Sequence, residues 1–348
     1  MRTITNATAT KLYDLNGVNQ VVVQKGNVGS SYIYALQLLN DQNDAMVYRA
    51  KKGESFKSIP TVVNGQKNEI TLNNVRQKSC LYLKGETSAN MTQAAGGHTQ
   101  TWEYAGSPKD NNKNGGWFIG TKPKSSKKPK WDTQIARVPF HAAYYTHNTD
   151  LPRISNLNAA GRNFEINYPG DNLVRAEAAV TPVTPDGRYK MLLIATVDKA
   201  GTGYFSLYDL SEINAALNAA GTSDVNLAKH PIGGNAKKAF KIPGFVDEVK
   251  SIQGYDIDNN LNIYVSSERA PKGSSAPRSI VKIPWGTTDS NSWDKIDLRN
   301  NKNLDINGFY TEFEGIQVIG ENNLYLTIAY HDANTGTTKN NRIYRVNW

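Results

Sequence analysis

The chain has 348 residues, 39% of them apolar and 20% charged, with a formal net charge of +9. This length supports a continuous hydrophobic core, while the lack of any run of 18 apolar residues excludes a membrane-spanning helix. The single cysteine, Cys80, excludes an intrachain disulfide and is expected to be a small buried residue. The N-terminal stretch MRTITNATATKLYDL has no apolar segment of the kind that a signal peptide requires.

A short phrase recurs along the chain, beginning with Gln or Glu and continuing through a strand, a turn and a second strand. The five copies begin at Gln20, Gln100, Glu177, Gln253 and Glu314. Their starts are 80, 77, 76 and 61 residues apart. Repetition at such intervals indicates one supersecondary unit that is stacked several times.

Each copy continues into a third strand, and turn residues such as Pro185-Asp186-Gly187 separate its first two strands. The expected third strands are Ala45–Arg49, Gln134–Val138, Gly203–Tyr208, Ser279–Ile283 and Arg342–Val346. Evenly spaced antiparallel strands in repeated units are typical of a β-propeller. We therefore expect an all-β fold in which residues 1–348 form one five-bladed propeller domain.

The two ends of the chain are expected to meet in the last blade. Only 34 residues follow Glu314, too few for a fourth strand after Arg342–Val346. The segment Lys11–Leu15 has no other partner, so it is expected to supply the outer strand and to close the ring without an unpaired edge. Between two of the blades, Asp209 and Gly221 predict the start and the end of a helix over Ser211–Ala220.

Part of the positive charge is concentrated in the stretch GTKPKSSKKPKW, which Pro and Ser residues mark as a loop. Its basic residues are Lys122, Lys124, Lys127, Lys128 and Lys130. Two interpretations stay open, a solvated loop or a binding site for a polyanion. Anionic cell-wall polymers, lipid headgroups and nucleic acid all satisfy the second interpretation.

Several long phrases resemble the helveticin J family of large, heat-labile bacteriocins from lactic-acid bacteria. They include QKGNVGSSYIYALQL, NTDLPRISNLNAAGRN, SIQGYDIDNNLNIYVSSERAP and IGENNLYLTIAYH. The resemblance runs from about residue 11 to residue 348 in the family's order. It implies a secreted antibacterial protein that acts on related Gram-positive cells. It carries over no catalytic residues.

In a propeller, the first strand of each blade lines the central channel. The initial residues of the five phrases would then form a polar ring near one mouth, which His98 is expected to join. The predicted ligand-binding residues are Gln20, His98, Gln100, Glu177, Gln253 and Glu314. Three interpretations stay open: a water-filled funnel, a mouth that binds a sugar or wall fragment, and a catalytic site.

A catalytic site would be a glycosidase centre with Glu177 and Glu314 as its two carboxyl groups, and with Asp150 and Asp256 as further candidates. Because three of the five ring positions are Gln, which cannot act as acid or nucleophile, we favour recognition over hydrolysis. The stretch from Asp256 to Asn260 resembles the start of a calcium loop but lacks its later ligands, so no metal or other cofactor is expected. Tryptophans that flank loops, among them Trp131, Trp285 and Trp293, either pack within the blades or offer flat faces to sugars.

The sequence and the resemblance together predict a secreted bacteriocin that binds the bacterial envelope and disrupts the wall or the membrane. Two alternatives remain, a cell-wall glycoside hydrolase and a lectin-like surface module associated with an S-layer. The expected partner is an anionic wall polymer, a glycan or a lipid, and no nucleic acid is expected. Export would proceed without a visible signal peptide, and the sequence leaves the oligomeric state open.

Overall fold

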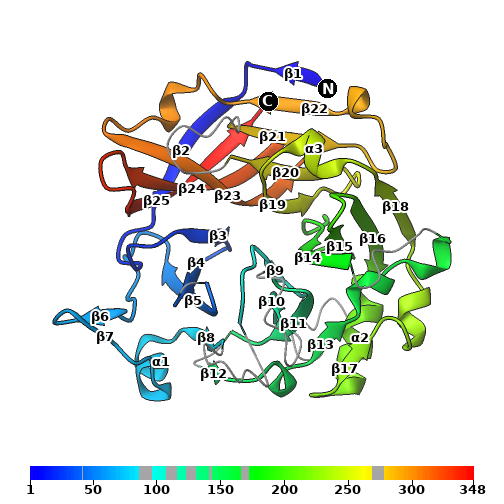
Figure 1. The fold of residues 1–348 in the computed structure, drawn as a ribbon, viewed down its shortest axis with the longest axis horizontal. Coiled ribbons are helices and arrows are strands. Elements are labelled where there is room, and N and C mark those ends of the chain that lie inside the picture. The colour runs from blue at the N-terminus through cyan, green and yellow to red at the C-terminus, as the bar shows by residue number, and fades with distance from the viewer. Residues whose placement is uncertain are drawn as a thin grey trace.

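A computed structural model of the chain describes residues 1–40, 42–85, 96–106, 116–122, 131–140, 143–165, 172–268 and 278–348. Its main strands form five sheets that stand around a central axis as the blades of a propeller (Figure 1). The all-β, five-bladed architecture expected from the repeats is therefore confirmed. The blades are numbered 1 to 5 in the order in which their innermost strands occur along the chain.

Every blade begins beside the axis and continues outward through hydrogen-bonded neighbours. Blade 1 contains β3 (Val23–Val28), β4 (Tyr32–Leu39), β5 (Asp44–Lys51), β8 (Leu81–Leu83) and β12 (Ala143–Tyr145). Blade 2 contains β9 (Trp102–Tyr104), β10 (Trp117–Thr121), β11 (Gln134–Val138), β13 (Arg153–Ser155) and β17 (Asp224–Asn226). Blade 3 contains β14 (Leu173–Val180), β15 (Met191–Asp198), β16 (Gly203–Asp209) and β18 (Lys238–Ile242).

The remaining two blades include strands from the N-terminus. Blade 4 contains β19 (Ile252–Ile257), β20 (Ile263–Ser267), β21 (Ser279–Ile283), β22 (Asp294–Asp297) and β1 (Arg2–Ile4). Blade 5 contains β23 (Phe309–Gly320), β24 (Asn323–Asp332), β25 (Thr338–Asn347) and β2 (Thr8–Asp14). A separate hairpin is formed by β6 (Val62–Val63) and β7 (Gln66–Lys67).

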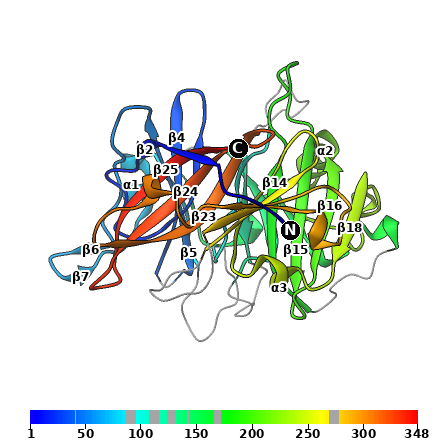
Figure 2. The same cartoon turned by 90° about the horizontal axis from the view of Figure 1, so that it is seen from above.

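The ring closes through the N-terminal strand, as the sequence predicts. Strand β2 pairs antiparallel with β25, with Thr8 opposite Asn347 and Ala9 opposite Val346 (Figure 2). Strand β1 adds in parallel to β22 of the neighbouring blade, where Arg2 pairs with Asp294. The first 14 residues therefore hold blades 4 and 5 together.

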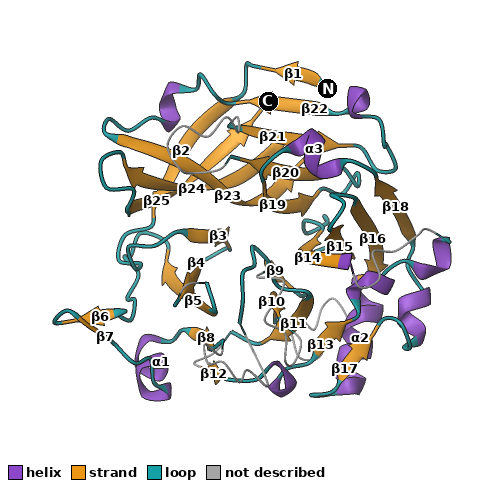
Figure 3. Cartoon of the chain, in the orientation of Figure 1, coloured by secondary structure: helices purple, strands orange, loops and turns teal. Residues whose placement is uncertain are grey.

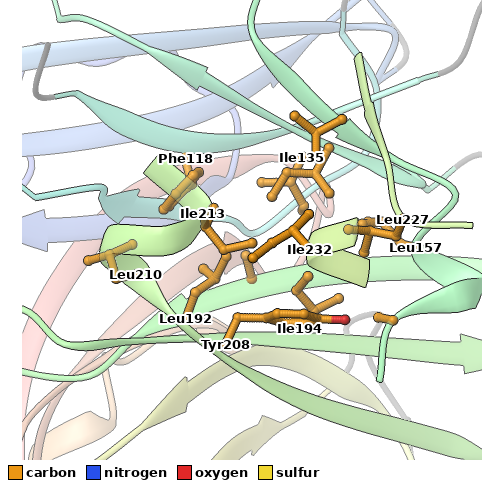
Figure 4. Packing of buried hydrophobic residues seen from close by; sticks show 14 of the residues in the cluster. Phe118, Ile135, Leu157, Leu192, Ile194, Tyr208, Leu210, Ile213, Leu227 and Ile232 are labelled. Carbon is orange, nitrogen blue, oxygen red and sulfur yellow. The ribbon is translucent and has the colours of Figure 1, made fainter. Parts of the chain in front are cut away.

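Alternation along the strands explains how the blades pack. In β15, Leu192 and Ile194 face blade 2, whereas Leu193 and Ala195 face blade 4. Successive side chains of a strand point to opposite faces, so a blade between two neighbours needs apolar residues at nearly every position. Buried clusters lie between all five pairs of adjacent blades, and Figure 4 shows the cluster between blades 2 and 3.

In the described residues, three α-helices accompany the strands (Figure 3): α1 (Leu72–Lys78), α2 (Leu210–Ala220) and α3 (Phe245–Val249). The predicted helix is confirmed as α2, since the Asp209 carboxylate accepts bonds from the amides of Ser211 and Glu212 and Gly221 ends it. The parallel additions β12 and β17 were not predicted. Each has three residues. Strand β12 follows the strands of blade 2 along the chain but joins blade 1, and β17 follows strands of blade 3 but joins blade 2. A local sequence pattern does not reveal such pairing.

Candidate functional site

Four of the predicted ring residues meet at the propeller axis. Gln100, Glu177, Gln253 and Glu314 come from blades 2 to 5, and all are buried. Gln100 lies two residues before the short strand β9, and the other three lie within β14, β19 and β23. The repeated phrase thus places its first polar residue near the axis in four of its five copies.

The first copy of the phrase is placed differently from the other four. Gln20 is exposed and lies three residues before β3, in a loop that the Gln37 side chain holds through Asn19 and Val21. The residue of blade 1 that reaches the axis is Gln24, which is only 6% exposed. Its side-chain oxygen has no hydrogen-bond partner within the described chain.

Close approach of the inner strands explains which residues can occupy the axis. Gln24, Gln253 and Glu314 each lie where their strand shifts register against its neighbour. Gly254 and Gly315 follow two of them, and a Cβ on Gly254 would lie 2.6 Å from the Cα of Gly315. A Gln or Glu followed within two positions by Gly is thus a sequence signal that also fits Gln24, since Gly26 comes two residues later.

The Glu177 carboxylate is enclosed by hydrogen-bond donors. It accepts bonds from the hydroxyl groups of Thr99 and Thr101, at 3.2 and 2.5 Å, and from the backbone amide of Gln100 at 3.2 Å. It also forms an ion pair with Arg175 at 3.2 Å. Because its oxygens are occupied in this way, Glu177 supports the channel wall and is not presented to a ligand.

Gln100 and Arg175 extend this network across the axis. The Gln100 amide donates to the Gln253 side chain at 3.0 Å and to the Glu314 carboxyl group, while Arg175 donates to Gln100 at 2.7 Å. Arg175 also donates to the backbone carbonyl groups of Ile252 and Gln253. Side chains from four blades are therefore joined in one buried polar network.

Burial raises the pKa of two carboxyl groups at or beside this network. It raises the pKa of Glu314 well above its ordinary value, and the nearby charge of Glu312 acts in the same direction. Burial also raises the pKa of Glu268 to about 7, although the Arg278 guanidinium opposes the shift. The protonated form of Glu314 that burial favours both donates and accepts hydrogen bonds.

An open pocket of about 1070 Å³ lies above the network, and we call it the axial pocket. Gln24, Gln253 and Glu314 reach it from the ring, and Glu312 lines it from the same strand as Glu314. His98 and Trp131 form part of its wall, as do the exposed side chains of Lys67 and Lys250. Among the predicted ring residues, Gln20, Gln100 and Glu177 do not line this pocket.

Trp131 connects the axial pocket to the buried network. The guanidinium carbon of Arg175 lies 3.6 Å from the centre of the Trp131 ring, and the His98 and Trp131 ring centres are 3.7 Å apart. The Nδ1 atom of His98 is 2.8 Å from the side-chain oxygen of Gln42. Of the three loop-flanking tryptophans, Trp131 lines the axial pocket, Trp293 belongs to a buried cluster between blades 3 and 4, and the half-buried Trp285 packs against that cluster.

The pairing of Glu177 with Glu314 as the two carboxyl groups of a glycosidase does not fit this geometry. Glu314 lines the axial pocket, but Glu177 lies outside its lining with its oxygens engaged. Asp256 lines a different pocket, and Asp150 belongs to a short 3₁₀ helix over Asn148–Asp150. A ligand in the axial pocket would meet amides, carboxyl groups, an aromatic ring and two lysines.

Comparison with known proteins gives the family. The family profile described as "Bacteriocin helveticin-J" matches residues 3–348. The chain is also 39% identical, over 367 aligned residues, to bacteriocin helveticin-J of Lactobacillus helveticus, with 99% of this chain and 98% of that protein covered. The chain belongs to the helveticin-J bacteriocin family. The resemblance noted in the sequence is thereby confirmed.

Solved structures show only distant likeness to this helveticin-J family member. An endo-arabinase from Bacteroides thetaiotaomicron aligns with a TM-score of 0.39 and 9% identity, covering 94% of both chains. A protein of unknown function from Dyadobacter fermentans aligns with a TM-score of 0.35 and 11% identity, covering 90% of this chain and 72% of that one. Likeness at this level carries no conclusion about activity.

The predicted polyanion site of this helveticin-J family member begins at a buried residue. Lys122 is only 4% exposed, and its side chain lies with the Asp132 carboxyl group around Gly97. This burial contradicts an exposed role for Lys122, because a basic side chain beside a buried carboxyl group compensates charge inside the protein. Lys124, Lys127, Lys128 and Lys130 lie outside the described residues.

Two further features of this helveticin-J family member concern metals and membranes. Within the described parts of the chain, no three His, Cys, Asp or Glu side chains gather in an arrangement that could hold a metal ion. The Asp258 carboxylate instead closes a hairpin turn by accepting bonds from the backbone and the side chain of Asn262. None of the described helices is long and apolar enough to cross a membrane.

Proposed function

We propose that this chain is a secreted antibacterial protein that binds the envelope of related Gram-positive bacteria at the axial pocket and then disturbs the wall or the membrane. Membership of a bacteriocin family supports the antibacterial role and the export. The geometry of the axial pocket supports recognition as the first step. The lethal event that follows binding is the part of the proposal that rests on the family alone.

The observation that carries the proposal is the chemistry of the axial pocket floor. The side chains of Gln24, Gln253 and Glu314 present amide and carboxylic acid groups from three different blades. Such groups donate and accept hydrogen bonds together, which matches the hydroxyl and acetamido groups of a glycan. Because the inner strands and the buried network hold these side chains in place, little conformational entropy is lost on binding.

The rim of the axial pocket favours a ligand with negative charge. Lys67 and Lys250 are exposed and line the pocket, and the whole chain carries a formal net charge of +9. Gram-positive walls present anionic polymers together with neutral glycans, so the exposed lysines would strengthen attachment by screened electrostatic attraction. The envelope component that we expect is therefore a wall glycan that carries or adjoins anionic groups.

A glycosidase remains the second candidate because of one specific observation. Glu312 and Glu314 both line the axial pocket, and burial raises the pKa of Glu314, as a general acid requires. Against catalysis, the Glu312 carboxylate lies 3.2 Å from Nε2 of His331 and is already paired. Hydrolysis also needs a second carboxyl group that faces the scissile bond, and Glu177 does not supply it.

The experiment that tests the proposal compares binding with hydrolysis on the same walls. Wild-type protein, Trp131→Ala and the control Trp285→Ala are incubated with isolated walls of a susceptible lactic-acid bacterium. We expect Trp131→Ala to weaken wall binding by about tenfold and Trp285→Ala to leave it unchanged, without release of reducing sugars. Release of reducing sugars would favour the glycosidase. Binding to walls by a protein that does not kill intact cells would favour a lectin-like surface module.

A further inference from the structure

A second pocket lies at the opposite end of the propeller channel, and we call it the distal pocket. In β3, Gln24 lines the axial pocket and Asn27 lines the distal one, and in β19 the same is true of Gln253 and Asp256. Three residues of a strand span about 10 Å, so the two pockets are separated along the axis. The distal pocket has a volume of about 610 Å³ and receives residues from all five blades.

The floor of the distal pocket carries carboxyl groups that are balanced by a buried lysine. Glu103 lines the pocket and pairs with Lys25, whose side chain is fully buried between the two pockets. Asp256 also lines it and accepts backbone bonds from Ile257 at 2.8 Å and Val318 at 2.6 Å. Burial raises the pKa of Asp256 well above its ordinary value, and this shift disfavours its charged form.

One amide of the distal pocket comes from the inner strand of blade 1. Asn27 is 5% exposed and lines the pocket. A side-chain amide both donates and accepts hydrogen bonds, so a ligand with complementary groups would gain from contact with it. The Asn27 side chain therefore points to a ligand that both donates and accepts hydrogen bonds.

Aromatic side chains form the wall of the distal pocket. Trp117 and Tyr34 line it with ring centres 4.4 Å apart, and Trp117 stacks on Trp102 at 4.7 Å with an angle of 2° between the rings. Tyr32 lines the same wall beside Tyr34. A rigid aromatic wall next to polar acceptors suits a ligand that has apolar C–H surface as well as hydroxyl groups.

We propose that the distal pocket is a second ligand site, which takes a neutral saccharide of one or two rings. The balanced floor disfavours an anion because neither Lys nor Arg lines the pocket among the described residues. It disfavours a cation because the Lys25 ammonium group lies beside the two carboxyl groups. A neutral sugar offers hydroxyl groups to Asn27, Glu103 and Asp256, and its C–H surface to the aromatic wall.

A saccharide site at each end would make the propeller bivalent. The axial and distal pockets open at opposite ends of the channel, so one molecule would contact two separate glycan segments. Simultaneous contacts raise the effective affinity for a polymeric wall well above that of either site. The distal site does not depend on the function proposed for the axial pocket, because the two pockets share no lining residue.

Calorimetric titration of the full-length protein with three neutral disaccharides tests the proposal. The probes are N,N′-diacetylchitobiose, cellobiose and maltose, each used up to about 10 mM, which detects dissociation constants in the millimolar range. Asn27→Ala removes an amide that lines the distal pocket, and Ser31→Trp fills the mouth of this pocket from an exposed turn. Ser223→Trp adds the same bulk at an exposed position outside both pockets, and Trp131→Ala alters only the axial pocket.

We expect at least one disaccharide to bind the wild-type protein, with affinity about tenfold lower in Asn27→Ala and in Ser31→Trp. Ser223→Trp and Trp131→Ala are expected to keep this binding, and melting temperatures confirm that each variant is folded. The proposal is overturned if none of the three disaccharides binds, or if either Asn27→Ala or Ser31→Trp leaves the affinity unchanged. Loss of saccharide binding in Trp131→Ala alone would assign it to the axial pocket and would also overturn the distal site.

Discussion

The side-chain amide of Gln100 in blade 2 donates a hydrogen bond to the carboxyl group of Glu314 in blade 5. These residues are 214 positions apart in the chain, and their contact crosses the propeller axis. The same amide group also reaches Gln253 of blade 4, while Arg175 of blade 3 donates to the Gln100 oxygen. The buried polar network thus connects four blades at the base of the axial pocket.

Glu177 and Glu314 are expected to respond differently to the same substitution. Glu177→Gln leaves the buried Arg175 without its carboxylate, so we expect the free energy of unfolding to fall by about 3 kcal/mol. Glu314→Gln replaces a carboxyl group whose neutral form is favoured by burial with a neutral amide of similar shape, and a loss below about 1 kcal/mol is expected. Urea denaturation measures both losses, and equal losses would contradict the raised pKa of Glu314.

Ring closure by the N-terminal strand predicts a sharp contrast between neighbouring residues of β2. Ala9 is buried between blades 4 and 5, whereas Thr10 is exposed on the opposite face. Ala9→Asp would bury an unpaired charge and is expected to lower the free energy of unfolding by about 3 kcal/mol or more. Thr10→Asp is the matched control, with an expected change within about 0.5 kcal/mol. Similar stability of the two variants would mean that β2 does not close the ring.

Stability is expected to fall with rising pH through Glu268. Burial raises its pKa in the folded protein to about 7, from 4.5 in an unfolded chain. The folded state therefore binds the proton more tightly, and its added stability is complete below pH 4.5 and is lost as pH rises toward 7. The expected loss is about 3 kcal/mol.

Thermal or urea unfolding at several pH values between 4.5 and 7.5 measures this dependence. Glu268→Gln keeps a neutral side chain, while Arg278 retains its ion pair with Asp305, so most of the decline between these pH values should disappear. Glu54→Gln changes an exposed carboxyl group and serves as the control. If Glu268→Gln and the wild-type protein decline equally, Glu268 is not the titrating group.

Charge at the rim of the axial pocket predicts binding that depends on salt. The double substitution Lys67→Glu with Lys250→Glu should weaken binding to whole target cells by about tenfold at about 50 mM salt. Screening should reduce this difference to less than about threefold at about 0.5 M salt. Lys199→Glu with Lys229→Glu makes the same change in charge at exposed positions outside the pocket. Equal effects of the two pairs would indicate attraction by net charge alone, without a role for the pocket.

The sequence predicted the repeated architecture more accurately than it predicted the site. Apolar and turn residues recur in each unit, and these local signals sufficed for five blades and for closure by the N-terminal strand. The sequence favours Gln20 over Gln24 because three valines follow Gln20, and only the bulge of β3 shows that Gln24 reaches the axis. Thr99 and Thr101 enclose Glu177 although they are 78 and 76 positions away in the chain. Lys122 is buried beside Asp132 and Gly97 by tertiary packing. Spacing along the chain reveals neither contact.

The central claim is that the axial pocket captures the target cell, and one killing assay tests it most directly. Wild-type protein, Trp131→Ala and Trp285→Ala are titrated against a susceptible Gram-positive strain at equal concentrations of folded protein. We expect Trp131→Ala to require about tenfold more protein for the same loss of viability, whereas Trp285→Ala should match the wild-type protein. Killing by Trp131→Ala at the wild-type concentration would contradict the claim.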